Sequence, residues 1–176
     1  WWHAVHFVYW NRTPLLERSL GYYSDILPAA RALAKQQGYR GVRWPKMVGP
    51  EGRDSPSNIG PLLIWQQPHP IYYAELCYDA HPNAATLTRY REIVFETAEF
   101  LASYAWFDST RAQFVLGPPV IPAQENHPPQ ETWNPTFELS YWRWALEVAQ
   151  RWRERLGMPR QPEWERVRRQ LAPLPQ

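Results

Sequence analysis

Proline is the residue that most limits how this chain can fold, because it lacks a backbone donor and breaks the interior of a helix or a strand. The sequence has 19 prolines among 176 residues, about twice the usual frequency of this residue. Prolines and glycines recur throughout two stretches, 38–70 and 117–135, and leave no room there for a long helix. We therefore predict two long loops, and loops of such length inside a compact domain are usually either functional or disordered.

The segments between these loops have the spacing of apolar residues that is typical of amphipathic helices. We predict helices at 13–37 (divided at Pro28), 71–80, 83–105, 135–156 and 162–171. Asp25 and Asn83 are expected to cap the helices that follow them, and a short strand is expected at 113–116. The sequence thus predicts an all-α fold, in which helix hairpins are joined by alternately short and long loops.

Composition argues against several kinds of partner. No apolar run approaches the roughly 18 residues that a membrane span needs. The net charge of +2 comes from 19 basic and 17 acidic residues, which is not the basic footprint of a nucleic-acid-binding protein. A single cysteine, and a pair of histidines (His3 and His6) with no third ligand at metal spacing, argue against a zinc site. We therefore expect no membrane, nucleic acid, metal or cofactor as a partner.

The first residues suggest that the sequence is a segment of a larger domain. The chain begins with Trp1-Trp2-His3, without a methionine and inside an apparent helix. It has no positively charged stretch before an apolar one, as a secretory leader would have. We expect residues 1–176 to form a single segment whose partner is the rest of its own catalytic domain, and no compartment can be assigned.

The polar residues that suit chemistry lie mainly in the two loops. Glu125 follows the apolar segment 114–121, and a carboxyl group held near apolar walls has a raised pKa and can act as a general acid. The alternative interpretation is that Glu125 is a loop carboxylate exposed to water. His69 lies between two prolines and is either a hydrogen-bonded structural residue or a catalytic one. Trp44 and Trp65 either stack on a sugar ring or cover the core.

Several blocks of this sequence, taken in order, resemble family 65 glycoside hydrolases and phosphorylases. The blocks LPAAR at 27–31 and GYRGVRWP at 38–45 are similar to the helix and loop before the active site of that family. Gln67-Pro68-His69 is similar to its next element, and the segment 114–127 resembles the stretch that bears its general acid. Lys46-Met47 and Pro122-Ala123 depart from the pattern, as in a distant member.

The resemblance implies a fold, a reaction and a set of site residues. The fold would be an (α/α)6 toroid of six helix hairpins, with a sugar pocket formed by the loops at one end. The reaction would be inverting hydrolysis of an O-glycosyl bond in oligosaccharides or glycoconjugates, with Glu125 as the acid and the base outside this chain. The substrate-binding residues would be Trp44, Lys46, Gln67, His69, Gln124, His127 and Asn134.

Two alternatives remain open at this point. One is a disaccharide phosphorylase of the same fold, although the sequence shows no basic phosphate site. The other is a non-catalytic carbohydrate-binding or helical scaffold module, in which the tryptophans serve packing alone.

Overall fold

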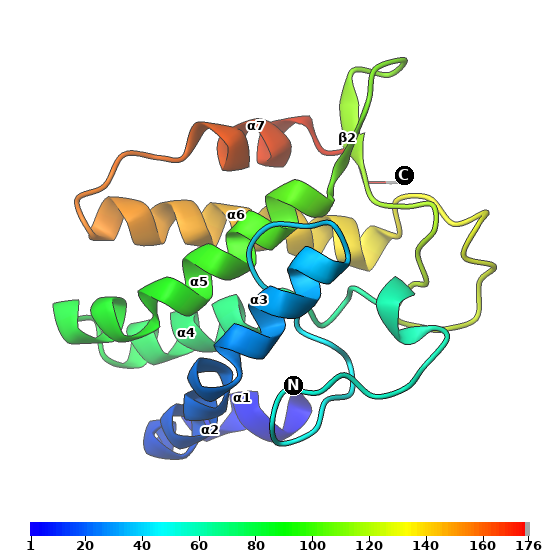
Figure 1. Ribbon diagram of the computed structural model, residues 1–176. Coiled ribbons are helices and arrows are strands. Elements are labelled where there is room, and N and C mark those ends of the chain that lie inside the picture. Colours follow the sequence, from blue (N-terminus) through cyan, green and yellow to red (C-terminus); the bar gives the residue numbers. More distant parts are fainter. Residues whose placement is uncertain (175–176) are drawn as a thin grey trace.

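Helices dominate the computed structural model, which describes residues 1–174 (Figure 1). The helices in this part of the chain are α1 (Trp2–Tyr9), α2 (Thr13–Asp25), α3 (Leu27–Gln36), α4 (His69–Ala80), α5 (Ala84–Tyr104), α6 (Thr136–Arg155) and α7 (Pro162–Gln170), with a 3-10 helix at Gly60–Leu62. The strands β1 (Trp106–Asp108) and β2 (Gln113–Val115) form an antiparallel hairpin. The predicted all-α class is confirmed.

Most of the helix boundaries follow from single residues. Pro28 divides the first helical stretch as predicted, since α2 ends at Asp25 and α3 begins at Leu27. Proline is tolerated in a first turn, where its missing N–H has no intrahelical partner to lose. Asn83 caps α5, because its side chain accepts a hydrogen bond of 3.0 Å from the Thr86 amide. The expected cap by Asp25 is wrong: Ile26 occupies the N-cap position of α3, and no side chain caps that helix.

The helices α4 to α7 run back and forth, so that each lies antiparallel to the next (Figure 1). The core lies between them and includes the fully buried side chains of Phe100, Leu101, Trp142, Trp152 and Trp164. The Trp142 indole also donates to the Leu101 carbonyl oxygen at 2.9 Å, which ties α6 to α5. This alternation places the loops that precede α4 and α6, at 37–68 and 116–135, on the same side of the molecule.

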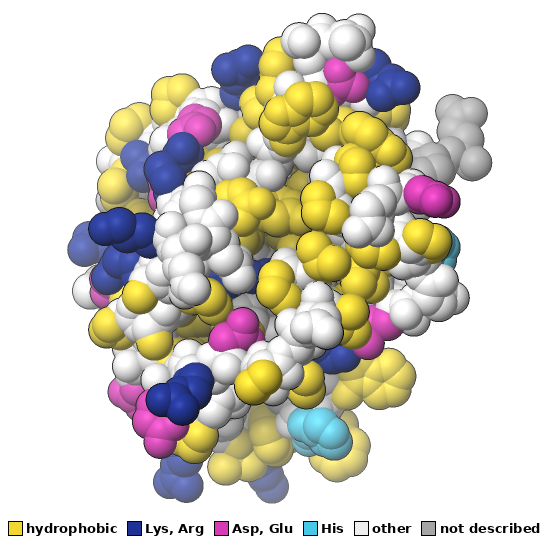
Figure 2. All heavy atoms as spheres, turned by 45° about the vertical axis from the view of Figure 1, so that its right-hand side comes forward, with side chains coloured by type: hydrophobic (Ala, Val, Ile, Leu, Met, Phe, Trp, Pro, Cys, Tyr) yellow, Lys and Arg dark blue, Asp and Glu magenta, His cyan; other side chains and the backbone are white. Residues whose placement is uncertain are grey.

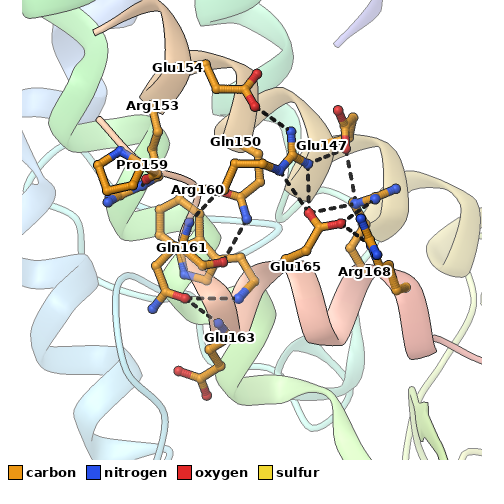
Figure 3. Close-up of polar contacts among 12 residues, drawn as sticks. Glu147, Gln150, Arg153, Glu154, Pro159, Arg160, Gln161, Glu163, Glu165 and Arg168 are labelled. Atoms are coloured by element: carbon orange, nitrogen blue, oxygen red, sulfur yellow. Dashed lines mark hydrogen bonds and ion pairs between the residues drawn. The ribbon is translucent and has the colours of Figure 1, made fainter. Parts of the chain in front are cut away.

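An ion-pair network fixes α7 against α6 (Figure 3). The Arg160 guanidinium contacts the carboxylates of Glu147, Glu154 and Glu165, at 2.7–2.9 Å. Arg168 pairs with Glu147 and Glu165, and hydrogen bonds from Arg168 and Arg160 lower the pKa of Glu165 to about 2. These arginine side chains near the end of the chain are therefore paired with acidic partners. No helix in the described part of the chain is long and apolar enough to span a membrane.

Candidate functional site

The loop before α4 is organised around a buried arginine. Arg43 is 1% exposed, and its guanidinium donates to the carbonyl oxygen of Leu63 at 2.6 Å and of Gly60 at 3.3 Å. A third hydrogen bond, of 3.3 Å, goes to Oε1 of Gln67. Burial lowers the pKa of Arg43 to about 10, so the side chain stays protonated at neutral pH. One cation thus joins the carbonyl groups of Gly60 and Leu63 to the Gln67 side chain beneath the loop.

Gln67 belongs to the same framework. It is fully buried: its Oε1 also accepts from the Trp44 amide at 2.9 Å, and its Nε2 donates to the Val42 carbonyl oxygen at 2.7 Å. These bonds make Gln67 part of the structure that holds the loop, while its contact with a sugar stays a prediction.

The two long loops meet at an ion pair between Lys46 and Glu125. The Lys46 ammonium contacts Oε1 of Glu125, and the two side chains are 29% and 30% exposed. Glu125 has a left-handed backbone with a φ of 58°, an uncommon conformation for a residue other than glycine and one that clusters at functional sites. Glu125 is exposed at this position, and the loop holds its carboxylate against a residue of the other loop.

A small cavity, here called the inner hollow, lies beside this ion pair. Its volume is about 220 Å³, and its lining includes Trp44, Lys46, Trp65, Gln66 and His69. Three polar atoms from these residues are buried without a hydrogen-bond partner among residues 1–174: Trp65 Nε1, Gln66 Oε1 and His69 Nε2. Buried polar atoms are nearly always paired in proteins. Their grouping around one cavity therefore marks a site that suits a polar ligand.

Trp44 lines the inner hollow with a fixed orientation. Its indole N–H donates to Oγ1 of Thr97 at 2.8 Å, and its ring packs edge-on against Tyr23 with 5.1 Å between centroids. Only 3% of this residue is exposed to solvent. The arrangement serves packing, one of the two roles considered for Trp44, while its contact with a sugar stays a prediction.

His69 begins α4 and is held from one side. Its Nδ1 lies 2.9 Å from the hydroxyl of Tyr141 on α6. Burial lowers the pKa of His69 to about 3, so the ring is neutral over the physiological range. A neutral imidazole with one nitrogen engaged can offer the other nitrogen to a ligand as a donor or an acceptor, depending on the tautomer.

A larger cavity, here called the aromatic hollow, adjoins the inner hollow and shares Trp1, Trp65 and His69 with it. Its volume is about 590 Å³, and the rest of its lining consists of Trp2, Tyr72, Ala123, Phe137, Ser140, Tyr141 and Trp144. Seen from the side of the loops, hydrophobic side chains crowd the middle of this face, and most charged side chains lie toward its margin (Figure 2).

The remaining predicted residues lie around a third cavity, here called the polar hollow. It has a volume of about 470 Å³ and is lined in part by Gln124, His127 and Asn134. Asn134 also exchanges two hydrogen bonds of 2.9 Å with the backbone of Leu116, and so closes the loop at its base. The structure thus places Lys46 and His69 around the inner hollow and pairs Lys46 with Glu125. Gln124, His127 and Asn134 line the polar hollow instead.

Glu138 is a candidate that sequence reasoning missed. It lies in the first turn of α6, is 1% exposed, and accepts a hydrogen bond of 2.8 Å from the Ala123 amide, two residues before Glu125. Its Oε2 is buried without a partner in the described residues, and burial raises its pKa. The burial that was expected for Glu125 is found here instead, at a residue that also lines the polar hollow. The signal available in the sequence was an acidic residue three positions after Pro135, on the otherwise apolar face of a helix.

Glu138 should make stability depend on pH. Its pKa in the folded protein lies above the ordinary 4.5, so the folded state holds this proton more tightly than the unfolded state. The stabilising contribution of Glu138 is complete below pH 4.5 and is lost as the pH rises through the pKa of Glu138 in the folded protein. We expect the unfolding free energy of the wild type to fall relative to that of Glu138→Gln over this window.

Urea denaturation of both proteins between about pH 4 and pH 8 measures this difference. Glu51→Gln, which removes an exposed carboxyl group from the other loop, is the matched control. If the free energies of unfolding of wild type and Glu138→Gln change in parallel with pH, the assignment of a raised pKa to Glu138 is contradicted.

In comparisons with models of known protein families and with the sequences of curated proteins, nothing matches this chain. Among the described residues, no group of three or more His, Cys, Asp or Glu side chains is placed to hold a metal ion. The functional assignment therefore depends on the cavities and on the chemistry of the side chains around them.

Proposed function

We propose that this chain forms the sugar-binding part of an inverting glycoside hydrolase, with Glu125 as its general acid. The observation that carries the proposal is the inner hollow beside the Lys46–Glu125 pair: three of its lining residues each have a buried polar atom with no hydrogen-bond partner in the described chain. Its volume of about 220 Å³ is below the roughly 300–1,000 Å³ of pockets for drug-sized ligands. We infer that it takes one monosaccharide unit.

The chemistry of the lining suits a sugar ring. Tyr23, Trp44 and Tyr73 supply apolar surface for its C–H groups. Hydroxyl groups both donate and accept hydrogen bonds. The hydroxyl groups of a single sugar can therefore pair with both the indole N–H of Trp65 and the side-chain oxygen Oε1 of Gln66. We propose that the helices belong to an (α/α)6 toroid; the supporting features are their antiparallel hairpins and the position of both long loops at one end.

In the proposed reaction the Glu125 carboxyl group donates its proton to the leaving glycosidic oxygen as the C–O bond breaks. A water molecule attacks the anomeric carbon from the opposite face, and its proton passes to a second carboxylate from another part of the domain. Lys46, which contacts Oε1 of Glu125, orients this carboxyl group. Gln124 and His127, which line the polar hollow, would bind further hydroxyl groups of the substrate.

The test is cleavage of α-linked and β-linked oligosaccharides by the intact protein and by its Glu125→Gln variant. Loss of a general acid is expected to lower the turnover number about 10²- to 10⁴-fold, and NMR of the first product formed should show inversion at the anomeric carbon. Glu51→Gln is the matched control, since it removes another exposed loop carboxylate outside the site. Wild-type turnover by Glu125→Gln would refute the assignment.

One observation favours a second candidate, a non-catalytic carbohydrate-binding module. Glu125 is exposed and already paired with a cation, whereas a general acid is usually enclosed by apolar groups that keep it protonated. This candidate predicts binding of oligosaccharides with no cleavage by either protein. Release of a sugar 1-phosphate only in the presence of phosphate would instead indicate a phosphorylase.

A further inference from the structure

We propose that the aromatic hollow binds a neutral aromatic group, which is the aglycone of the substrate. The inference rests on the proposed function, since that function places the sugar in the inner hollow. The group attached to the sugar would then lie in the adjoining aromatic hollow. The two cavities share Trp1, Trp65 and His69, so one ligand can extend from the first into the second.

The walls of the aromatic hollow are built from rings on two helices. On α6, Phe137, Tyr141 and Trp144 follow one another at helical spacing and so face the same way. Their neighbouring ring centroids are 5.5 and 5.7 Å apart. Tyr72 on α4 continues this wall, with its ring centroid 5.3 Å from that of Trp144. Tilted rings at these spacings present the faces and edges with which another aromatic ring packs favourably.

The polarity of the hollow argues against a second sugar unit as its occupant. None of its lining side chains is a carboxylate, an ammonium or a guanidinium. The Tyr141 hydroxyl is engaged by His69 and the Tyr72 hydroxyl by Tyr9, so the polar side-chain groups left for a ligand are the Ser140 hydroxyl, the tryptophan indole N–H groups and one nitrogen of His69. A sugar has hydroxyl groups around its whole ring, and burying them without partners costs free energy. An aromatic group needs few partners.

The volume is also larger than an isolated ring requires. About 590 Å³ lies within the range of pockets for drug-sized ligands, so a fused pair of rings fits. Phe137 is 47% exposed and Ser140 is exposed on the same helix face. Substitutions at these two positions change the wall of the hollow without disturbing the core.

The test is binding of 2-naphthol to the intact protein by calorimetry, together with cleavage of 2-naphthyl and methyl glycosides of the same sugar. We expect 2-naphthol to bind, and Phe137→Ala and Trp144→Ala each to weaken it up to about tenfold through the lost ring contact. Ser140→Trp, which fills the hollow, should abolish binding. Trp106→Ala removes an exposed ring on β1, outside the hollow, and should leave the affinity for 2-naphthol unchanged.

The cleavage assay gives a second measurement. The KM for the naphthyl glycoside should be lower than for the methyl glycoside, and Ser140→Trp should remove this difference.

Failure of this inference can be distinguished from failure of the proposed function. One outcome is that 2-naphthol binds, the hollow variants weaken its binding, and neither glycoside is cleaved. This outcome supports an aromatic group as the occupant of the aromatic hollow and overturns the proposed hydrolase activity. Cleavage of both glycosides with equal KM, together with no binding of 2-naphthol, overturns the inference and leaves the hydrolase. Binding of 2-naphthol that Ser140→Trp does not affect also overturns it, because the site would then lie elsewhere.

Discussion

Replacing Arg43 with leucine is expected to lower the free energy of unfolding by about 3 kcal/mol or more. The guanidinium is the buried donor for the carbonyl oxygens of Gly60 and Leu63 and for Oε1 of Gln67. Leucine fills part of the volume but donates nothing, so these acceptors lose a charged partner at buried or half-buried positions. Hydrogen bonds to charged groups contribute about 1.5–3 kcal/mol each, and their losses do not simply add.

Urea denaturation measures this effect, and Arg40→Leu is its matched control. Arg40 lies three residues earlier and makes two ion pairs, with Glu99 and Glu163, but its side chain is 52% exposed. Exposed pairs contribute at most about 1 kcal/mol each, so we expect a much smaller loss. Equal losses in the two variants would show that the buried hydrogen bonds of Arg43 do not organise the loop.

Replacing Glu75 with leucine should have a similarly large effect, about 3–5 kcal/mol. Glu75 lies on α4, is 7% exposed, and accepts from the Trp152 indole at 2.6 Å and from two nitrogens of Arg155 at 2.7 and 3.0 Å. The substitution leaves the Arg155 guanidinium without its bidentate partner and the fully buried Trp152 N–H without an acceptor. The connection between α4 and α6, which also form the walls of the aromatic hollow, is then broken.

A double-mutant cycle separates these contributions. Glu75→Leu combined with Arg155→Met removes both charges, and because an uncompensated charge is the main cost, we expect the double variant to be more stable than Glu75→Leu alone. Glu92→Leu, which breaks the exposed pair with Arg31, should cost less than about 1 kcal/mol. Strictly additive losses at Glu75 and Arg155 would contradict this account.

Local sequence signals predicted the helices well but only part of the site. Proline positions and apolar spacing located the described α-helices from α2 onward, because both act within a few residues along the chain. The 3-10 helix at Gly60–Leu62 lies in a stretch that was predicted as a loop. The hairpin strand β1 was missed, since its pairing with β2 depends on a partner outside its own segment. The framework role of Gln67 could not be predicted either, because it depends on Arg43, which lies 24 residues away.

The cavities illustrate the same limit. The apolar spacing within 135–156 indicated an amphipathic helix, but not that Phe137 and Tyr141 border a cavity instead of the core. That outcome depends on His69 and Trp65, which come from a different loop and helix. Glu138 was passed over because a carboxylate in the first turn of a helix is usually exposed. Its burial results from the Ala123 amide and the loop that folds over it.

The measurement that tests the central claim most directly is an NMR titration of the tryptophan indole N–H signals with α-linked and β-linked disaccharides and their monosaccharides. Trp65 lines the inner hollow, and its buried Nε1 has no partner in the part of the chain described. The indoles of Trp142, Trp152 and Trp164 are hydrogen-bonded within the core and serve as internal references. The account predicts that at least one of these sugars shifts the Trp65 signal in a saturable manner and leaves the three references unchanged. If no sugar shifts Trp65, or if all four signals move together, the inner hollow is not a carbohydrate site.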